Sequence, residues 1–316
     1  RKPSFKSKRE RFVVKALAML SLVRWYNVFV LTCALYLSSM YMLNSSVSKV
    51  YILKDIYLNM NILGIDCLLM AGYIINGFYD FEKDMINHPK QTIFGRVVSK
   101  SFCFNSYIFL LFLGLGLSSF SGWKVFLFNT VFSFGLWFYS HKLRKKPLTG
   151  ELGATLLTVS PFASISIYYM TTNLTIILFV GYIAALTLTR EVVKRMVSLK
   201  GDLIVGEKSI PIIFGIRNCK YIILSFMIAS MIMIIVLFPK ILAKDISYYF
   251  GASFTMIFIS TFILRASKIP TQFNRINIYT KDLLFWQSDQ YFGINAHSCV
   301  VLTQEFFGGR GSFFHK

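Results

Sequence analysis

Long apolar blocks, separated by short charged loops, recur along the whole 316-residue chain. Each block has the length, about 17–25 residues, that an α-helix needs to cross the hydrocarbon core of a bilayer. With 55% hydrophobic and 15% charged residues, the chain is also too apolar for an ordinary soluble domain. The sequence therefore predicts an all-α integral membrane protein, with spans at 21–43, 60–79, 102–120, 123–140, 152–171, 174–190, 219–238 and 247–264.

The chain divides into three segments by composition. Residues 1–20 form a basic arm, residues 21–265 a polytopic membrane domain, and residues 266–316 a divergent segment of mixed polar and aromatic character. Within that last segment, 283–303 is either irregular or a degraded ninth span. We expect no cleavable signal peptide, because the arm leads into a long apolar block and not into a short one with a small-residue cleavage site.

The net charge of +20 is distributed by topology and does not indicate nucleic-acid binding. Basic residues gather in the N-terminal arm and in every second loop, as the positive-inside rule requires of cytoplasmic segments. This predicts a cytoplasmic N-terminus and cytoplasmic loops at 80–101, 141–151 and 191–218, with the lipid bilayer as the charged partner. Up to residue 281, the basic residues that fall on the other side are Lys49, Lys54, Lys124, Lys240 and Lys244.

A polar stripe ends the second apolar block. Asn76, Asp80 and Asp84 are four residues apart, so on a helix advancing about 100° per residue they lie within about 80° of one another. Such side chains are costly at the end of a span unless they have a function. Oxygen atoms of this kind are the ligands that Mg²⁺ takes, usually while it contacts a substrate phosphate. The stripe predicts a magnesium site, and the alternative is a solvated helix end.

A second stripe follows the sixth apolar block. Glu191, Arg195, Ser198 and Asp202 are spaced by 4, 3 and 4 residues, which places them within about 60° of one another on a helix. The stripe is acidic at its ends and basic in its middle. Its alternative interpretation is a cytoplasmic helix with an ion pair between Glu191 and Arg195.

Basic and amide side chains border the same loops. Arg24 and Asn27 lie three residues apart near the cytoplasmic end of the first span, where they face a cavity or Arg24 extends to the lipid headgroups. After the fourth span, Lys142 lies closest to the membrane and is the best candidate to bind a phosphate. The basic residues at 144–146 are more typical of a positive-inside loop.

These motifs, in this order, resemble those of the UbiA superfamily of intramembrane prenyltransferases. Asn76–Asp84 is similar to its Asn-Asp-x-x-Asp-x-x-x-Asp motif, and Arg24–Asn27 to its Arg-x-x-Asn. Tyr139–Lys142 is similar to its Tyr-x-x-Lys, and Arg190–Asp202 to its second acidic motif. The resemblance covers roughly residues 15–265.

The resemblance implies about nine helices around a central cavity, with Asp-rich motifs that hold Mg²⁺. The metal binds the diphosphate of an isoprenoid donor, and the isoprenoid group passes to a hydrophobic lipid or aromatic acceptor. The resemblance assigns catalytic roles to Asp80, Asp84 and Asp202, metal ligation to Asn76, Asp80 and Asp84, and substrate binding to Arg24, Asn27, Tyr139, Lys142, Lys194 and Arg195.

The chain departs from the family pattern at three positions. Gly77 stands where the family has the first Asp of its first motif, and Arg195 and Ser198 stand where it has acids of the second. One interpretation is an enzyme with one Mg²⁺, in which Arg195 acts as a fixed cation on the diphosphate. The alternatives are an inactive relative that binds isoprenoid lipid or a membrane partner, and a transporter or channel that is only similar in sequence.

Overall fold

The computed structural model describes residues 19–20, 22–44, 47–87, 99–144, 146–199, 202–203, 209–241, 247–266 and 276, with the side chains of 80–87, 241 and 266 excepted. Within these ranges every regular element is a helix, so the predicted all-α class is confirmed. The predicted arm, except for its last two residues, and the predicted ninth span lie outside the described residues.

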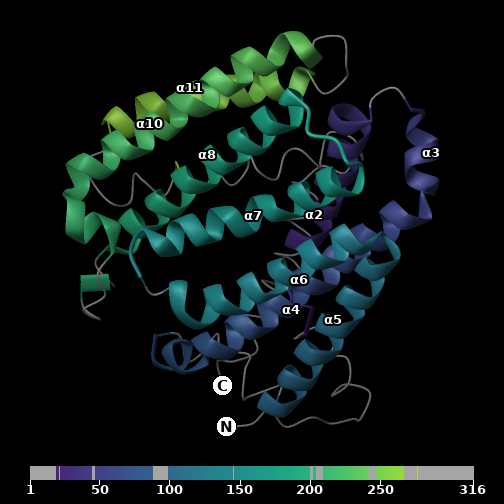
Figure 1. Cartoon of the computed structure of the whole chain (residues 1–316). Helices are drawn as coiled ribbons and strands as arrows, with labels where there is room; N and C mark the ends of the chain where they lie inside the picture. Colours follow the sequence, from purple (N-terminus) through teal and green to yellow (C-terminus); the bar gives the residue numbers. More distant parts are fainter. Residues whose placement is uncertain are drawn as a thin grey trace, which may run out of the picture.

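Each of the eight predicted spans corresponds to a helix. Six of these helices are long and apolar enough to cross a membrane by length and composition among the described residues, and α6 and α7 are the other two. In chain order the elements are α2 (Trp25–Ser38) with the π-helical turn η1 (Ser39–Leu43), α3 (Lys49–Lys54), α4 (Ile56–Asn87), α5 (Lys100–Phe120), α6 (Trp123–Phe138) with the π-helical turn η2 (Tyr139–Leu143), α7 (Thr149–Tyr168), α8 (Leu174–Val197), α10 (Ile210–Ile241) and α11 (Ser247–Ala266) (Figure 1).

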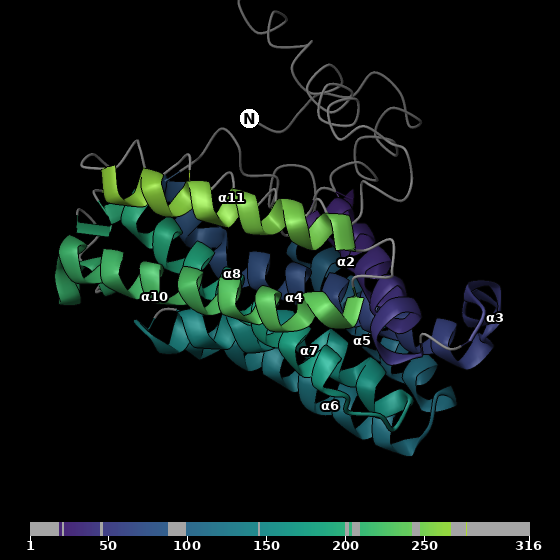
Figure 2. The same cartoon turned by 90° about the horizontal axis from the view of Figure 1, so that it is seen from above.

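The long helices lie side by side, and most pack against their neighbours in the chain. α5 packs on α4, α6 lies against α4 and α7, α8 lies against α7 and α10, and α11 packs on α10. In the view of Figure 2, α11 lies on one side of the molecule and α6 on the opposite side, with α4, α7 and α8 between them. α2 contacts α4 and α7.

Short polar side chains cap the starts of α4 and α5. The Asp55 carboxylate accepts hydrogen bonds from the backbone amides of Tyr57 and Leu58, and the Ser99 hydroxyl accepts one from that of Phe102. Such caps satisfy amides that have no partner inside the helix. They fix where α4 begins, and therefore which residues reach its far end.

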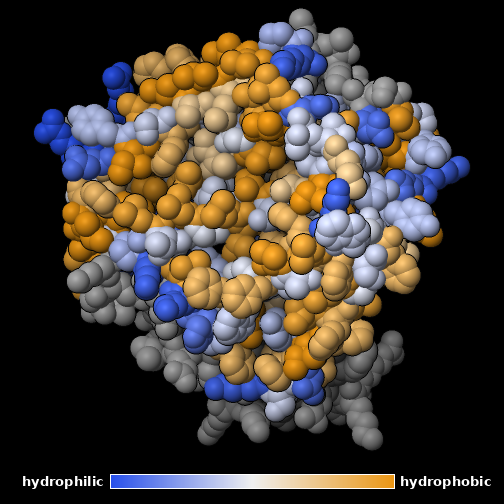
Figure 3. Space-filling view, in the orientation of Figure 1, coloured by the Kyte–Doolittle hydropathy of each residue, from blue (hydrophilic) through white to orange (hydrophobic). Residues whose placement is uncertain are grey.

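Large apolar side chains cover much of the outer surface. Figure 3 shows broad apolar areas on one face, with hydrophilic residues gathered mainly towards the edges. Phe109 and Phe112 on α5 are 66% and 70% exposed, and Ile232 on α10 is 55% exposed. A surface this apolar is suited to lipid and not to water.

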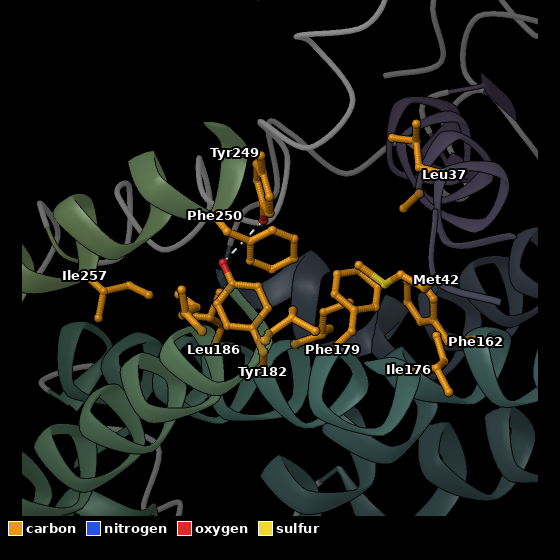
Figure 4. Close-up of a cluster of buried hydrophobic side chains, with 14 of the residues drawn as sticks. Leu37, Met42, Phe162, Ile176, Phe179, Tyr182, Leu186, Tyr249, Phe250 and Ile257 are labelled. Atoms are coloured by element: carbon orange, nitrogen blue, oxygen red, sulfur yellow. Dashed lines mark hydrogen bonds between the residues drawn. The ribbon is translucent and has the colours of Figure 1, made fainter. Parts of the chain in front are cut away.

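An aromatic cluster joins α8 to α11 in the interior. Phe179, Tyr182 and Phe250 are fully buried, with ring centroids 5.8–6.5 Å apart (Figure 4). The hydroxyl groups of Tyr182 and Tyr249 lie 3.3 Å apart, within hydrogen-bond distance. The ring separations fit edge-to-face and tilted packing, which adds to the energy of burial.

Four helices are linked by a buried polar network. The amide nitrogen of Asn129 on α6 donates to the Asn61 Oδ1 on α4 at 3.0 Å and to the Ser118 Oγ on α5 at 2.8 Å. The Ser164 hydroxyl on α7 donates to the Asn129 Oδ1 at 2.9 Å. All four side chains are fully buried, so these hydrogen bonds replace contacts with water that the groups have lost.

We predict that Asn129→Leu destabilises the protein by about 2 kcal/mol, because three buried polar groups lose a partner at once. Thermal unfolding in detergent micelles measures the effect. Thr130→Ala is the matched control, since Thr130 is only half-buried and its hydroxyl donates to the Phe126 carbonyl of its own helix. Equal melting temperatures for the Asn129→Leu and Thr130→Ala variants would contradict the prediction.

Candidate functional site

The first polar stripe lies near the C-terminal end of α4. This helix continues to Asn87, so the predicted helical register of Asn76, Asp80 and Asp84 is confirmed. The Asn76 side chain is described, whereas those of Asp80 and Asp84 lie outside the described residues. In this register the two acids follow Asn76 along the same face, one and two turns further on.

Arg144 brings a positive charge onto this stripe. It follows η2, between α6 and α7, and its Nη1 donates a hydrogen bond of 2.7 Å to the Oδ1 of Asn76. A charge-assisted bond of this length is among the stronger hydrogen bonds of proteins. The loop between α6 and α7 is therefore attached to α4 at the start of the stripe.

Arg195 on α8 reaches the same loop. Its Nε donates to the Oε1 of Glu151 at 3.1 Å, and its Nη2 donates to the backbone carbonyl of Arg144 at 3.2 Å. Glu151 lies in the first turn of α7 and is only 3% exposed. The alternative of an ion pair between Glu191 and Arg195 is wrong, because Arg195 turns towards α7 while Glu191 pairs with Lys194 at 3.5 Å.

The turn η2 packs closely on α7. A Cβ on Gly153 would lie 3.0 Å from the ring of Tyr139, so this glycine allows the tyrosine to approach the helix. His141 stacks on Trp137 with a centroid distance of 5.5 Å and lies 5.2 Å from the ring of Tyr79 on α4. These contacts hold the turn in place and leave Lys142 exposed beside the site.

Arg24 also lies at this end of α4. It precedes α2 with a left-handed backbone (φ 50°), and its guanidinium sits 5.4 Å from the centroid of the Tyr73 ring, one turn before Asn76. This is the geometry of a cation–π contact. Asn27, the third residue of α2, is half-buried.

The remaining predicted residues lie on α8 and just after it. Lys194 pairs with Glu191 and is exposed. Asp202 is buried, and its Oδ2 accepts a hydrogen bond of 3.2 Å from the Ser198 hydroxyl. The structure therefore joins Asn76, Arg195 and the α6–α7 loop directly, whereas Asp202 is tied to its own segment.

Two residues of this assembly were not among the predicted site residues. Arg144 is one of several basic residues in its loop, and sequence alone favours a topological role for it. Glu151 carried a usable signal, because a lone acid at the start of an apolar block is costly without a partner. That partner, Arg195, is 44 residues away in the chain, so the pairing itself was not readable.

The two stripes differ in the ligand atoms that they offer to Mg²⁺. The first offers an amide oxygen and, by helical register, two carboxylates on one face, which suits a hard cation. The second has in its middle a guanidinium, which has no lone pair for a metal ion, and the Ser198 hydroxyl, which is hydrogen-bonded to Asp202. Among the described residues there is no group of three or more His, Cys, Asp or Glu side chains that could hold a metal ion.

The chain is similar in sequence to known membrane prenyltransferases. A profile described as the UbiA prenyltransferase family matches residues 55–278. A digeranylgeranylglyceryl phosphate synthase of Korarchaeum cryptofilum is 33% identical over 172 residues, which cover 53% of this chain and 60% of that relative. A synthase of the same name from Saccharolobus solfataricus is 27% identical over 253 residues, covering 79% and 83% of the two chains.

Solved structures share the fold. One, described as a digeranylgeranylglyceryl phosphate synthase in membranes, has a TM-score of 0.66 at 18% identity and covers 87% of this chain and 97% of its own. A UbiA homolog from Archaeoglobus fulgidus bound to DMAPP and Mg²⁺ has a TM-score of 0.62 at 17% identity, with 86% and 99% covered. At these identities the likeness shows the fold, and the profile match to most of the chain shows the family. This protein is an integral membrane protein that belongs to the UbiA prenyltransferase family.

Proposed function

We propose that this protein is a prenyltransferase that moves an isoprenoid group from a prenyl diphosphate to a hydrophobic acceptor. The observation that carries the proposal is the contact of Arg144 with Asn76, in a member of the UbiA family. This contact places a guanidinium, suited to phosphate oxygens, at the start of an oxygen-rich stripe suited to Mg²⁺. A prenyl diphosphate with its metal needs both kinds of group.

The first stripe would hold the metal and the loop would hold the diphosphate. Asn76, Asp80 and Asp84 would bind one Mg²⁺, which when bound offsets charge developing on the departing diphosphate. Arg144 and Lys142 would bind the diphosphate oxygens from the side of the α6–α7 loop. Arg24 adds a further positive charge at this end of α4.

The acceptor we propose is a glyceryl phosphate that already carries an isoprenoid ether. Several relatives are named digeranylgeranylglyceryl phosphate synthases, and cationic side chains beside the stripe would favour an acceptor that bears a phosphate. We place the N-terminus and the site on the cytoplasmic side, because the basic residues gather in the loops at that end.

A second candidate is an inactive family member that binds isoprenoid lipid or a membrane partner. Gly77, Arg195 and Ser198 favour it, because each replaces an acid of the family pattern. The two candidates differ in whether the bound diphosphate is released.

The test uses purified full-length protein and labelled geranylgeranyl diphosphate, with and without Mg²⁺. The prenyltransferase predicts donor binding that needs Mg²⁺, followed by diphosphate release when an acceptor is supplied. Binding without release across glyceryl phosphate and aromatic acceptors would favour the inactive member. No Mg²⁺-dependent binding at all would refute the proposed metal–diphosphate site.

We predict that Arg144→Ala raises the KM for the donor about 10- to 100-fold, which corresponds to about 1.4–2.7 kcal/mol of lost binding. The lost group is the charged contact nearest Asn76. Lys146→Ala is the matched control, because Lys146 is exposed in the same loop and should leave the KM within about twofold, as expected of a residue that acts only through topology. Equal KM values for the two variants would remove Arg144 from the site.

A further inference from the structure

The second motif has the chemistry of a salt bridge and not of a metal site. Arg195 and Ser198 stand at the positions where the family pattern has acids, and the neighbouring acid, Asp202, accepts a hydrogen bond from Ser198. Mg²⁺ is bound by oxygen ligands, and a guanidinium has no lone pair to offer a metal ion. This segment therefore does not fit a second Mg²⁺.

Arg195 also does not replace that metal ion as an unpaired positive charge. Its charge is paired with Glu151, whose side chain is nine-tenths or more buried, and two of its donors are used by Glu151 and the Arg144 carbonyl. A paired acid and base contribute no net charge to the site. The function of Arg195 must then lie in what the pair holds in place.

The pair holds Arg144. The Arg144 carbonyl accepts from Arg195 on α8, and the first turn of α7 packs against the same carbonyl, since a Cβ on Gly150 would lie 3.0 Å from it. From this fixed backbone the Arg144 side chain reaches Asn76 on α4. Three helices thus determine the position of one guanidinium.

We propose that Glu151 and Arg195 form a metal-free clamp that positions Arg144 for the donor diphosphate, so that the protein binds one divalent cation per donor and not two. This rests on the proposed function and adds a stoichiometry and two positioning residues to it. In place of a second metal ion, the positive charge on the diphosphate would come from the Arg144 guanidinium, which the clamp holds in position.

The first measurement counts Mn²⁺ by electron paramagnetic resonance on the full-length protein, with saturating geranylgeranyl diphosphate. The clamp predicts one Mn²⁺ per bound donor, and two would overturn it. A wild-type protein that binds no donor would instead refute the proposed function, and the clamp with it. The two failures are therefore distinguishable.

The second measurement is a double-mutant cycle between Glu151→Gln and Arg144→Ala. Glu151→Gln should raise the donor KM about tenfold in the wild-type background, with kcat within about threefold, and should have no further effect on KM once Arg144 is alanine. A purely structural role for Glu151 would give the same KM increase in both backgrounds, and that result would overturn the proposal.

Two further variants keep this cycle interpretable. Asp55→Asn leaves one acceptor oxygen where the carboxylate has two, one for the Tyr168 hydroxyl and one for the first amides of α4. This change lies at the opposite end of α4, so it should lower the melting temperature without changing the donor KM. Arg195→Lys keeps the charge opposite Glu151 but loses the forked pair of donors. If Glu151→Gln does not fold, Arg195→Lys takes its place in the cycle. It should raise the donor KM when Arg144 is present and should have no effect on KM when residue 144 is alanine. An equal increase in both backgrounds would contradict the clamp.

Discussion

Replacing both Asp80 and Asp84 by alanine is expected to lower the rate of prenyl transfer at least 1000-fold, while leaving the protein folded. By register, positions 80 and 84 fall on the same face of α4 as Asn76, in a helix that runs to residue 87. Without them the metal would lose its charged ligands, and the charge that develops on the leaving diphosphate would lose its main compensation. A 1000-fold loss corresponds to about 4 kcal/mol of transition-state stabilisation.

Single-turnover assays with labelled geranylgeranyl diphosphate measure this loss, with size-exclusion chromatography as the check on folding. Glu82→Ala is the control, because position 82 is two residues from each acid and therefore falls on the opposite face of the helix by register. It should retain at least a third of the wild-type rate. Wild-type activity in the double alanine variant would place the chemistry elsewhere.

Gly114→Val on α5 is expected to destabilise the protein by about 3 kcal/mol or more. A Cβ at residue 114 would lie 2.8 Å from the backbone carbonyl oxygen of Gly64 on α4 and 2.9 Å from the Cγ of Leu68. A backbone atom cannot move aside as a flexible side chain can, so α4 and α5 would have to separate. Close approach through small residues is a common way for membrane helices to associate.

Gly116→Val tests this claim on the same helix. A Cβ at residue 116 would have no neighbouring atom within 4 Å, so this variant should change stability by less than about 1 kcal/mol. The backbone effect of replacing a helical glycine is similar at both positions and cancels in the comparison. Thermal unfolding of the two proteins in the same detergent gives the comparison. Equal destabilisation would show that the α4–α5 contact is looser than the structure indicates.

The fold was readable from the sequence because the membrane imposes a length and a composition on each helix. All eight predicted spans fall on helices, although α6 is only 16 residues long and needs the turn η2 to extend it. Span limits were less readable. α10, for example, begins at Ile210, nine residues before the predicted start, and bends at Gly215, where φ is 77°.

The site was readable only where its residues follow one helix. The spacing of Asn76, Asp80 and Asp84 is a local pattern, so sequence alone gave their register. The pairing of Arg195 with Glu151 depends on how α7 packs against α8, and no local pattern contains that information. For the same reason sequence reasoning offered Glu191 as the partner of Arg195, since that pair is four residues apart and this one is 44.

The proposed prenyl transfer is tested by supplying the full-length protein with Mg²⁺, labelled geranylgeranyl diphosphate and geranylgeranylglyceryl phosphate, and analysing the lipids by mass spectrometry. We expect a glyceryl phosphate with two isoprenoid ethers, formed with one equivalent of diphosphate, and no such product without Mg²⁺. Donor that remains unreacted with this acceptor and with aromatic acceptors, in a protein shown to be folded, would contradict the proposal.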